Sequence, residues 1–403
     1  MKVAVIGQGY VGLPLAISIA NAGHEVIGFD VNPKITDQLN SGVSHIEDIK
    51  NSELNTVIEK IKYRATSDPK LLSESEIAII AVPTPLDENR NPDISFVESA
   101  SRILGESLRS SALIVNESTS YPGTLREVIA PMVAKHSPAG IKHRFAVSPE
   151  RVDPGNEKWK IKNTPRLMAG LDSNAGKEVV DFYSTFCDEI TLLSSPEVAE
   201  SAKLFENTFR QVNIALVNEF SLICRALGIS VHEVLDAANT KPYGFMKFTP
   251  GIGVGGHCIP VDPSFLAFAA EKLGADAKFI QLANEVNFNR PEAIIHEISR
   301  ELKEEFKDKS VLLVGISYKP NISDVRESPA LRFMEVLRMK NKVSWYDPIV
   351  GSWNGETSSI LDKTKFDVVI FSNIHAGTPI NELISSGKLI IDLTGKIEGV
   401  INL

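Results

Sequence analysis

The sequence predicts an α/β protein with two doubly wound parallel-sheet domains, joined by a long central helix and a helical middle domain. Three observations favour this fold class. Short apolar runs alternate with helical patterns in the first half, helical spacing continues unbroken from Pro196 to about Gly228, and the last third returns to alternation. Such alternation is typical of parallel sheets with helices on their faces. We expect domains at residues 1–195, 196–300 and 301–403.

The first domain contains five expected strands, each rich in β-branched or aromatic residues and followed by turn or helix-start residues. They are KVAVIG (2–7), EVIGFD (25–30), IAIIAVP (77–83), ALIVNES (112–118) and HRFAVSPE (143–150). Two further runs, RLMAG (166–170) and EITLL (189–193), extend the edge of the same sheet in this interpretation.

The central segment has no internal proline or glycine, and its apolar residues recur at steps of three and four, which is helical spacing. These residues are Val198, Ala202, Phe205, Phe209, Val212, Leu216, Phe220, Ile223 and Leu227. A helix of this length extends roughly 50 Å at 1.5 Å per residue. It usually spans domains or packs against a second subunit, although a core helix within one chain gives the same pattern. Helical patterns resume at 262–274 and 276–305.

The last third returns to strands with helical patterns between several of them. The expected strands are KSVLLVGISY (309–318), KVSWYDP (342–348), FDVVIFSN (366–373) and KLIIDLTG (388–395).

Composition narrows the class of protein. With 403 residues, 43% hydrophobic and 23% charged, the chain is too long for one ordinary core and has an average globular composition. A net charge of −9 disfavours nucleic-acid binding. No apolar run approaches the roughly 20 residues of a membrane helix, and the N-terminus lacks a signal-peptide pattern. Three scattered cysteines fit a reduced cytoplasm and argue against a metal site.

Gly7, Gly9 and Gly12 form G-x-G-x-x-G directly after the first expected strand, and Asp30 ends the second. The glycines allow a tight turn and a close approach of a pyrophosphate to the helix N-terminus, while the acid binds a ribose hydroxyl. A 2′-phosphate would meet this carboxylate, so the pattern favours NAD over NADP. The VPTP segment (82–85), after the third strand, lines the same crevice in this interpretation.

The segment TPGIGVGGHCIPVDPSF (249–265) surrounds Cys258 with glycines and prolines. A buried structural thiol is the commoner role of a lone cysteine, and Cys187 and Cys224 fit it because their surroundings are apolar. Cys258 lies in a loop with little core to bury it, so we consider it a candidate nucleophile.

Two neighbours of this cysteine carry chemistry of their own. His257 either lowers the pKa of the thiol or points away from it. Asp262 lies four residues further on and is a candidate acid, base or water-positioning group.

Together these motifs resemble the UDP-glucose/GDP-mannose dehydrogenase family, the nucleotide-sugar 6-dehydrogenases. The resemblance covers essentially the whole chain. It rests on GQGYVGLPLA (7–16), VPTP (82–85), ESTSYPGT (117–124), SPERVDPG (148–155), AKLFENTFR (202–210), GIGVGGHCIPVDP (251–263) and SYKPNISDVRESPA (317–330).

The resemblance implies a reaction in four stages. A primary alcohol, C6 of the sugar, becomes a carboxylate while two NAD⁺ are reduced. The intermediate aldehyde is held on a cysteine as a thiohemiacetal, a second hydride leaves a thioester, and water hydrolyses it. A covalent hold prevents escape of the reactive aldehyde.

Carried onto this sequence, the resemblance makes Cys258 the nucleophile. Lys203 would stabilise oxyanions and share in proton transfer, and Asn207 would donate to the same oxygen. These two residues are four apart, hence on one face of a helix.

The remaining catalytic roles concern the hydrolysis. By the same resemblance Asp262 and Thr119 would hold the catalytic water. Glu150 of the SPER motif would be its acid or base.

The resemblance also implies the ligand contacts. Those for NAD would be Gly7, Gly9, Tyr10, Val11, Gly12, Asp30, Pro83, Thr84, Ser118, Thr119 and Arg326. Those for the UDP-sugar would be Glu150, Arg151, Lys203, Asn207, Gly253, Gly255, Gly256, Tyr318 and Lys319.

The C-terminal α/β domain would hold the UDP. Lys319, Asn321 and Arg326 form a basic loop suited to a diphosphate or to closing over the cofactor. Without the resemblance, two cations in a loop are more often ordinary surface charge.

The cysteine loop departs from the UDP-glucose pattern GGYCLPKD, because it reads GGHCIPVD with His257 and Val261. This motif, together with ESTSYPGT and KPYGFM (241–246), resembles the branch that oxidises UDP-N-acetylhexosamines. The glycines at 253 and 255–256 would leave room for an acetamido group. The preference is for N-acetylglucosamine, with N-acetylmannosamine close behind, and the product would be a precursor of surface polysaccharide.

Three alternatives stay open at this point. They are a UDP-glucose 6-dehydrogenase, a one-hydride hydroxy-acid dehydrogenase, and a non-catalytic module that binds NAD or a nucleotide sugar. The family resemblance and the long helix together predict a homodimer or a higher assembly. The scattered cysteines predict a cytoplasmic location, and the net charge and the lack of long apolar runs predict no nucleic-acid or membrane partner.

Overall fold

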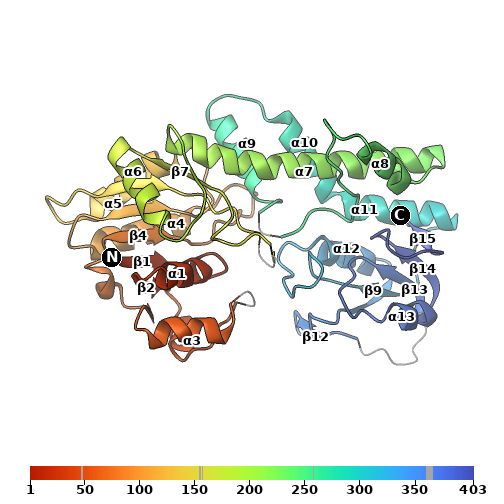
Figure 1. Cartoon of the computed structure of the whole chain (residues 1–403). Coiled ribbons are helices and arrows are strands. Elements are labelled where there is room, and N and C mark those ends of the chain that lie inside the picture. The colour runs from red at the N-terminus through yellow and green to blue at the C-terminus, as the bar shows by residue number, and fades with distance from the viewer. Residues whose placement is uncertain (47–48, 154–155, 157, 257, 360–365) are drawn as a thin grey trace. The chain divides into compact units, whose positions relative to one another are not determined.

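The computed structural model describes residues 1–46, 49–153, 156, 158–256, 258–359 and 366–403. Its contacts divide the chain into two compact units. Unit 1 comprises Met1–Phe205 with Phe268–Leu273, and unit 2 comprises Glu206–Ala267 with Gly274–Leu403 (Figure 1). The three-domain boundaries expected from the sequence stay a prediction, although the α/β architecture with two parallel sheets is confirmed.

Unit 1 is built on an eight-stranded sheet of order β3-β2-β1-β4-β5-β6-β7-β8, parallel except between β6 and β7. The strands are β1 (Lys2–Ile6), β2 (Glu25–Phe29), β3 (Tyr63–Thr66), β4 (Ile77–Ile80), β5 (Leu113–Asn116), β6 (Arg144–Val147), β7 (Arg166–Gly170) and β8 (Ile190–Leu192). All seven expected strands are present. The sequence analysis missed β3, whose four residues include only one apolar pair that faces the core.

Helices cover both faces of this sheet because its strands bury both sets of alternating side chains. Val3 and Val5 pack with one set of helices, and Ala4 and Ile6 with the other. The first set is α1 (Gly12–Asn21), α2 (Pro33–Asn40), α3 (Asn51–Glu59) and α6 (Ser173–Tyr183). The second is η1 (Pro69–Leu72), α4 (Ser95–Ser107), η2 (Leu125–Ile129) and α5 (Ala130–His136).

Unit 2 contains a five-stranded parallel sheet of order β10-β9-β13-β14-β15. Its strands are β9 (Ser310–Val314), β10 (Lys342–Tyr346), β13 (Phe366–Phe371), β14 (Gly387–Asp392) and β15 (Ile401–Asn402). Helices α11 (Arg290–Leu302) and α12 (Pro329–Arg338) pack on one face, and α13 (Ile380–Ser386) on the other. The short strands β11 (Ser352–Trp353), β12 (Glu356–Thr357) and β15 were not expected.

The helical part contains α7 (Pro196–Leu227), α8 (Val231–Asn239), α9 (Asp262–Lys272) and α10 (Lys278–Phe288). Figure 1 shows α7 as one continuous helix, as the sequence predicts. It ends at Leu227, and the next residue, Gly228, has a φ of +71°, in the left-handed region that favours glycine. The pattern at 276–305 is two helices, because the chain breaks at Asn289 ahead of Pro291, which has no N–H to continue a helix.

The buried face of α7 in unit 2 carries the amides Gln211 and Asn218 beside apolar Val217 and Cys224. Asn218 Nδ2 donates to Asn287 Oδ1 at 3.0 Å, and Asn287 Nδ2 donates to the Gln211 carbonyl at 3.1 Å. Asn218 also accepts the Gly251 N–H at 2.9 Å, which fixes the start of the cysteine loop. Helix and loop are therefore joined by specific hydrogen bonds.

In the described part of the chain, no single helix is long and apolar enough to cross a membrane. Only α7 joined to α8, across a bend of 118°, meets that length and composition as a pair.

Candidate active site

The turn from β1 to α1 requires glycine at two positions and leaves space at a third. Gly7 has φ +92°, and a Cβ there would lie 2.4 Å from the Ala81 carbonyl oxygen. A Cβ on Gly12 would lie 1.8 Å from the Gly7 oxygen, whereas a Cβ on Gly9 would meet no atom within 4 Å. The space beside Gly9 is what a pyrophosphate approaching the helix N-terminus needs.

Asp30 stands at the carboxyl end of β2 and is held toward this turn. Its carboxylate accepts the Gln8 N–H at 3.0 Å and the Asn32 N–H at 2.9 Å, and the residue stays half-exposed. A carboxylate in this place fits the ribose hydroxyls of NAD and repels a 2′-phosphate. The residues present therefore fit NAD.

The carboxyl ends of β4 and β5 lie beside this turn, since both strands follow β1 in the sheet. Ser118 links them: its hydroxyl accepts the Val82 N–H at 2.8 Å and donates to the Val82 carbonyl at 2.9 Å. Thr84 is buried and Pro83 exposed. Thus the expected cofactor residues of unit 1 gather at the edge where the strand order reverses, the usual ligand position in such sheets.

A buried cluster of charges lies behind the same edge. Arg166, the first residue of β7, is fully buried, with Nη1 at 3.0 Å from Glu117 Oε1 and Nη2 at 2.9 Å from Glu150 Oε2. Tyr183 from α6 donates its hydroxyl to Glu117. The sequence analysis named Glu150 but missed the other three. A signal was available, because a charged residue inside an apolar strand is rarely buried without a partner.

Glu150 is the best satisfied member of this cluster. Besides Arg166, its carboxylate accepts the Arg151 N–H at 2.7 Å and the Val152 N–H at 2.6 Å. Burial alone would raise its pKa, but the Arg166 charge and the Val152 hydrogen bond outweigh burial and hold the pKa below the usual value. The charge of buried Lys203, on α7, acts in the same direction.

Glu200, one turn before Lys203 on α7, is a second residue that the sequence analysis missed. It accepts the N–H groups of Gly123 at 2.8 Å and Leu125 at 3.2 Å, and the Ser120 hydroxyl at 3.3 Å. Burial raises its pKa to about 8, against the backbone hydrogen bonds that lower it. Glu200 thereby ties α7 to the loop that follows Ser118 and Thr119.

The other catalytic candidates belong to unit 2. The structure brings Asn207 and Asp262 together: Asn207 Nδ2 donates to Asp262 Oδ2 at 2.6 Å, and Asp262 is buried. Cys258 is exposed and lies one turn before α9, with its carbonyl accepting the Asp262 N–H at 2.8 Å. By contrast Cys187 and Cys224 are buried, as expected. His257 lies outside the described residues.

The glycines of the cysteine loop serve packing. A Cβ on Gly255 would lie 2.6 Å from Pro329 Cδ and 2.7 Å from Tyr318 Cβ, and one on Gly256 would lie 2.8 Å from the Tyr318 ring. A Cβ on Gly253 would meet Pro329 at 3.1 Å. In the Cβ direction the space is thus filled by Tyr318 and Pro329, and the expectation that these glycines leave room for an acetamido group stays a prediction.

The loop after β9 carries the remaining substrate candidates. Tyr318 and Lys319 are half-buried, and Arg326 is exposed with Nε 3.0 Å from Asp324 Oδ1. The Arg326 carbonyl accepts the Gly256 N–H at 3.3 Å, so this loop and the cysteine loop lie against each other. Within the described ranges, no group of three or more His, Cys, Asp or Glu side chains is placed to hold a metal ion.

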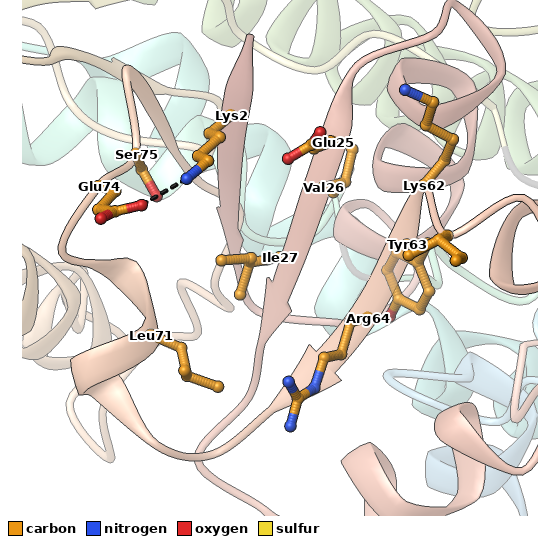
Figure 2. Close-up of a pocket in the computed structure, with 11 residues that line it drawn as sticks. Lys2, Glu25, Val26, Ile27, Lys62, Tyr63, Arg64, Leu71, Glu74 and Ser75 are labelled. Atoms are coloured by element: carbon orange, nitrogen blue, oxygen red, sulfur yellow. Dashed lines mark hydrogen bonds and ion pairs between the residues drawn. The ribbon is translucent and has the colours of Figure 1, made fainter.

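A cavity of about 350 Å³ lies elsewhere in unit 1 (Figure 2). It is lined by the first residues of three strands, among them Lys2, Glu25 and Tyr63, and Lys2 pairs with Glu74 at its rim. This is the amino end of the parallel strands, opposite the edge with the glycine turn, so the cavity has no part in the cofactor site.

The fold and the glycine turn define an α/β protein with an NAD-binding sheet domain. Comparison with known families makes this specific: the NAD binding, central and UDP binding domains of the UDP-glucose/GDP-mannose dehydrogenase family match residues 1–187, 197–289 and 312–393. The chain belongs to this family.

Individual relatives agree with the family. A UDP-N-acetyl-D-mannosamine dehydrogenase from Pyrococcus horikoshii is 35% identical over 382 residues, covering 93% of this chain and 90% of the relative. A UDP-N-acetyl-D-glucosamine 6-dehydrogenase from Pseudomonas aeruginosa is 33% identical over 359 residues, 87% of this chain and 84% of the relative. The solved structure of a UDP-D-ManNAc dehydrogenase from P. horikoshii superposes with a TM-score of 0.89 at 32% identity, covering 100% of this chain and 98% of that one.

Proposed function

We propose that this protein oxidises the C6 alcohol of a UDP-N-acetylhexosamine to the uronic acid, with two NAD⁺ reduced per sugar and Cys258 as covalent nucleophile. The observation that carries the proposal is the proximity of three residues. Asn207 on α7 donates to Asp262, the first residue of α9, and the exposed Cys258 lies one turn before Asp262. Relatives that act on UDP-N-acetylmannosamine or UDP-N-acetylglucosamine support the substrate class. The proposal covers both epimers.

In this mechanism NAD⁺, when bound, accepts a hydride in each oxidation. The Cys258 thiolate adds to the aldehyde carbon and prevents its escape. Asn207 donates a hydrogen bond to the developing oxyanion, and Lys203 stabilises the same negative charge and exchanges its proton. A one-hydride dehydrogenase needs none of the cysteine chemistry.

Hydrolysis of the thioester needs a held water and a base. Asp262 and Thr119 position the water in this proposal, and Glu150 accepts its proton. Because Asp262 is tied to Asn207 at 2.6 Å, the residue that binds the oxyanion also fixes the residue that orients the water. The product is an N-acetylhexosaminuronic acid linked to UDP, a precursor for surface polysaccharide made in the cytoplasm.

The outer face of α7 supports the proposal of a homodimer. Residues of the predicted apolar stripe are exposed: Phe205 is 64% exposed, Leu216 62% and Leu227 67%, whereas Gln211, Val217 and Asn218 are buried. A contiguous exposed apolar face of this kind marks an interaction site. We expect a second copy of the chain to cover it, and sedimentation at micromolar concentration to show a dimer or larger species. Phe205→Glu with Leu216→Glu should give monomers.

The substrate is tested with purified protein, NAD⁺ and four sugars in turn. These are UDP-N-acetylglucosamine, UDP-N-acetylmannosamine, UDP-N-acetylgalactosamine and UDP-glucose. NADH formation with an acetamido sugar supports the proposal and identifies the epimer. Turnover of UDP-glucose alone contradicts the assigned branch, and binding of NAD without NADH from any sugar favours a binding module.

A further inference from the structure

The buried charges around Arg166 do not balance. Glu117 and Arg166 are 0% exposed, and Glu150 is nearly as deeply buried, so one guanidinium faces two carboxyl groups away from water. Two ionised carboxylates beside one cation would leave a net buried charge, which is costly. Pairs of this kind keep one proton and titrate together.

The contacts show which carboxyl group holds that proton. Glu150 accepts two backbone N–H groups as well as Arg166, as expected of a carboxylate. Glu117 Oε1 meets Arg166 and the Tyr183 hydroxyl, whereas no donor among the described residues reaches its buried Oε2. The contact between the two carboxyl groups raises the pKa of Glu117 and lowers that of Glu150, so the shared proton stays on Glu117. Burial raises the pKa of Glu117 to about 7, the Arg166 charge lowers it, and the Glu150 charge raises it again.

The groups around the pair lie on α6, just after α6, on β7 and on α7, and they do not compete for this proton. Burial raises the pKa of Tyr183 on α6 well above its usual range, so it stays a neutral donor. Burial likewise raises the pKa of Cys187, just after α6, to about 11. Arg166 on β7 stays charged, and Lys203 on α7 adds a positive charge beside Glu150. Among the described groups that face the cluster, Glu117 is the one that titrates near neutral pH.

We propose that Glu117 is a positioning residue that makes Glu150 a usable base, because the two carboxyl groups share Arg166 and take up the proton of the hydrolytic water as a pair. The inference rests on the proposed function of Glu150. A carboxylate held by Arg166 and two backbone N–H groups alone is a weak base. With Glu117 ionised, the pair takes up one proton near neutral pH: Glu150 receives it from the water, and Glu117, whose pKa burial raises to about 7, then holds it.

The water oxygen bonds to the thioester carbon, one water proton goes to Glu150, and the C–S bond breaks with its electron pair left on the Cys258 sulfur. The second water proton is released when the product acid ionises. Glu150 then returns its proton to solvent, with the negative charge of the pair shared on Arg166.

The kinetic test follows the thioester rather than the overall rate. Protein mixed with NAD⁺ and its sugar is quenched at intervals, and the acylated Cys258 is quantified by mass spectrometry across about pH 5.5–8.5. In the wild type, hydrolysis should accelerate as pH rises through about 7. Glu117→Gln should leave the first burst of NADH unchanged, slow hydrolysis about ten- to a hundredfold, and flatten this pH dependence.

Two further variants separate tuning from structural damage. Tyr183→Phe removes a hydrogen bond that lowers the pKa of Glu117, so the rise in hydrolysis should move to higher pH. A structural defect has no reason to move it in that direction. Glu178→Gln, which loses the Arg144 pair on the surface of α6, is the matched control and should behave as wild type.

Infrared titration of the ligand-free protein tests the pair without turnover. Glu200, with a pKa of about 8, also contributes a protonated-carboxyl band. The wild type should lose a second such band as pH rises through about 7, and Glu117→Gln should lack only this second band. Absence of the second band in the wild type overturns the inference, as does a hydrolysis profile of Glu117→Gln that superimposes on the wild type. If no sugar gives NADH, the proposed function fails, and the infrared result still decides whether the pair shares a proton.

Discussion

The same turn occurs in both sheets, after β1 in unit 1 and after β9 in unit 2. Gly7 donates its N–H to the Phe29 carbonyl and Gly315 to the Tyr346 carbonyl, both at 2.8 Å. The next N–H donates to an aspartate at the end of the neighbouring strand, Asp30 at 3.0 Å in one unit, and in the other Asp347 at 2.9 Å. Asp30 and Asp347 therefore occupy equivalent positions in the two sheets.

The two acids nevertheless face different partners. Asp30 is half-exposed and can meet a ribose. Asp347 is 2% exposed and also accepts the N–H groups of Ile349 and Val350 at 2.9 Å, with His375 Nε2 at 3.0 Å. The turn after β1 therefore leaves its aspartate accessible to a ligand, whereas in the turn after β9 the aspartate is fully used by hydrogen bonds within the chain.

His375 extends this closure to the loop with the substrate candidates. Its Nδ1 accepts the Asn321 N–H at 2.9 Å, which assigns the proton to Nε2, where Asp347 and the Ser317 hydroxyl lie at 3.0 and 3.2 Å. The loop that bears Tyr318 is therefore held from both ends. In unit 2 the acid is thus occupied by its own chain, and the predicted contacts to UDP lie in this loop.

The largest effect should come from breaking the closed turn. Asp347→Ala leaves His375 and several buried N–H groups without an acceptor, so we expect a loss of about 3–5 kcal/mol in the free energy of unfolding. Asp30→Ala should change that free energy by less than about 0.5 kcal/mol, since its site is half-open. Chemical denaturation measures both, and equal losses would contradict the comparison.

Gly9 and Ser317 occupy the same position in the two turns, so Gly9→Ser makes the open turn resemble the closed one. A Cβ at Gly9 meets no atom, hence the fold should persist. The side chain should obstruct the pyrophosphate and weaken NAD binding about a hundredfold, as measured by calorimetry. Gly351→Ser, also in open space, is the control that should bind NAD normally.

Asp30→Ala should weaken NAD binding about tenfold, because it removes hydrogen bonds between a charged group and the ribose. It should also reduce the preference for NAD over NADP, since the carboxylate that repels a 2′-phosphate is gone. Competition binding with both cofactors measures this ratio. An unchanged ratio would mean that Asp30 does not face the ribose, and exposed Asp37→Ala serves as the matched control.

His375→Ala should release the loop after β9 and weaken UDP binding about fivefold, with NAD binding unchanged. The effect is the smallest because Asp347 keeps its backbone donors. Calorimetry with UDP measures it, and half-buried His136→Ala, in unit 1, should have no effect. A loss of NAD binding instead would contradict a role confined to the UDP loop.

Acid unfolding sharpens the role of Asp347. Burial alone would raise its pKa, but the hydrogen bonds from His375 and the backbone hold it below the usual 3.8. A depressed folded-state pKa stabilises the protein above the unfolded value, and this stability is lost as pH falls through the folded value. The stability difference between wild type and Asp347→Asn should therefore shrink below about pH 4.

Periodicity predicted the long helix and eleven of the strands because these depend on local spacing. It missed β3, where Tyr63 and Ala65 give too short an apolar pattern. Periodicity also identified the apolar stripe of α7 but not which face of the helix is buried. That depends on tertiary contacts such as the hydrogen bonds of Asn218 with Asn287 and Gly251.

The sequence predicts those site residues that belong to a local backbone motif. It does not predict side-chain pairs whose two members come from distant parts of the chain. Gly7 and Asp30 follow from the turn itself. Arg166 and Glu117 come from separate strands, so their pairing is visible only once β5 and β7 are placed in the sheet. That Gly255 and Gly256 of the cysteine loop pack against Tyr318 was likewise not visible in the sequence, because the two segments are far apart along the chain.

The most direct test of the proposed chemistry is the number of NADH molecules formed per nucleotide sugar consumed, in the wild type and in Cys258→Ala. The account predicts two for the wild type, with the Cys258→Ala variant unable to complete the second oxidation. One NADH per sugar in the wild type, or two in Cys258→Ala, would contradict a thioester on Cys258.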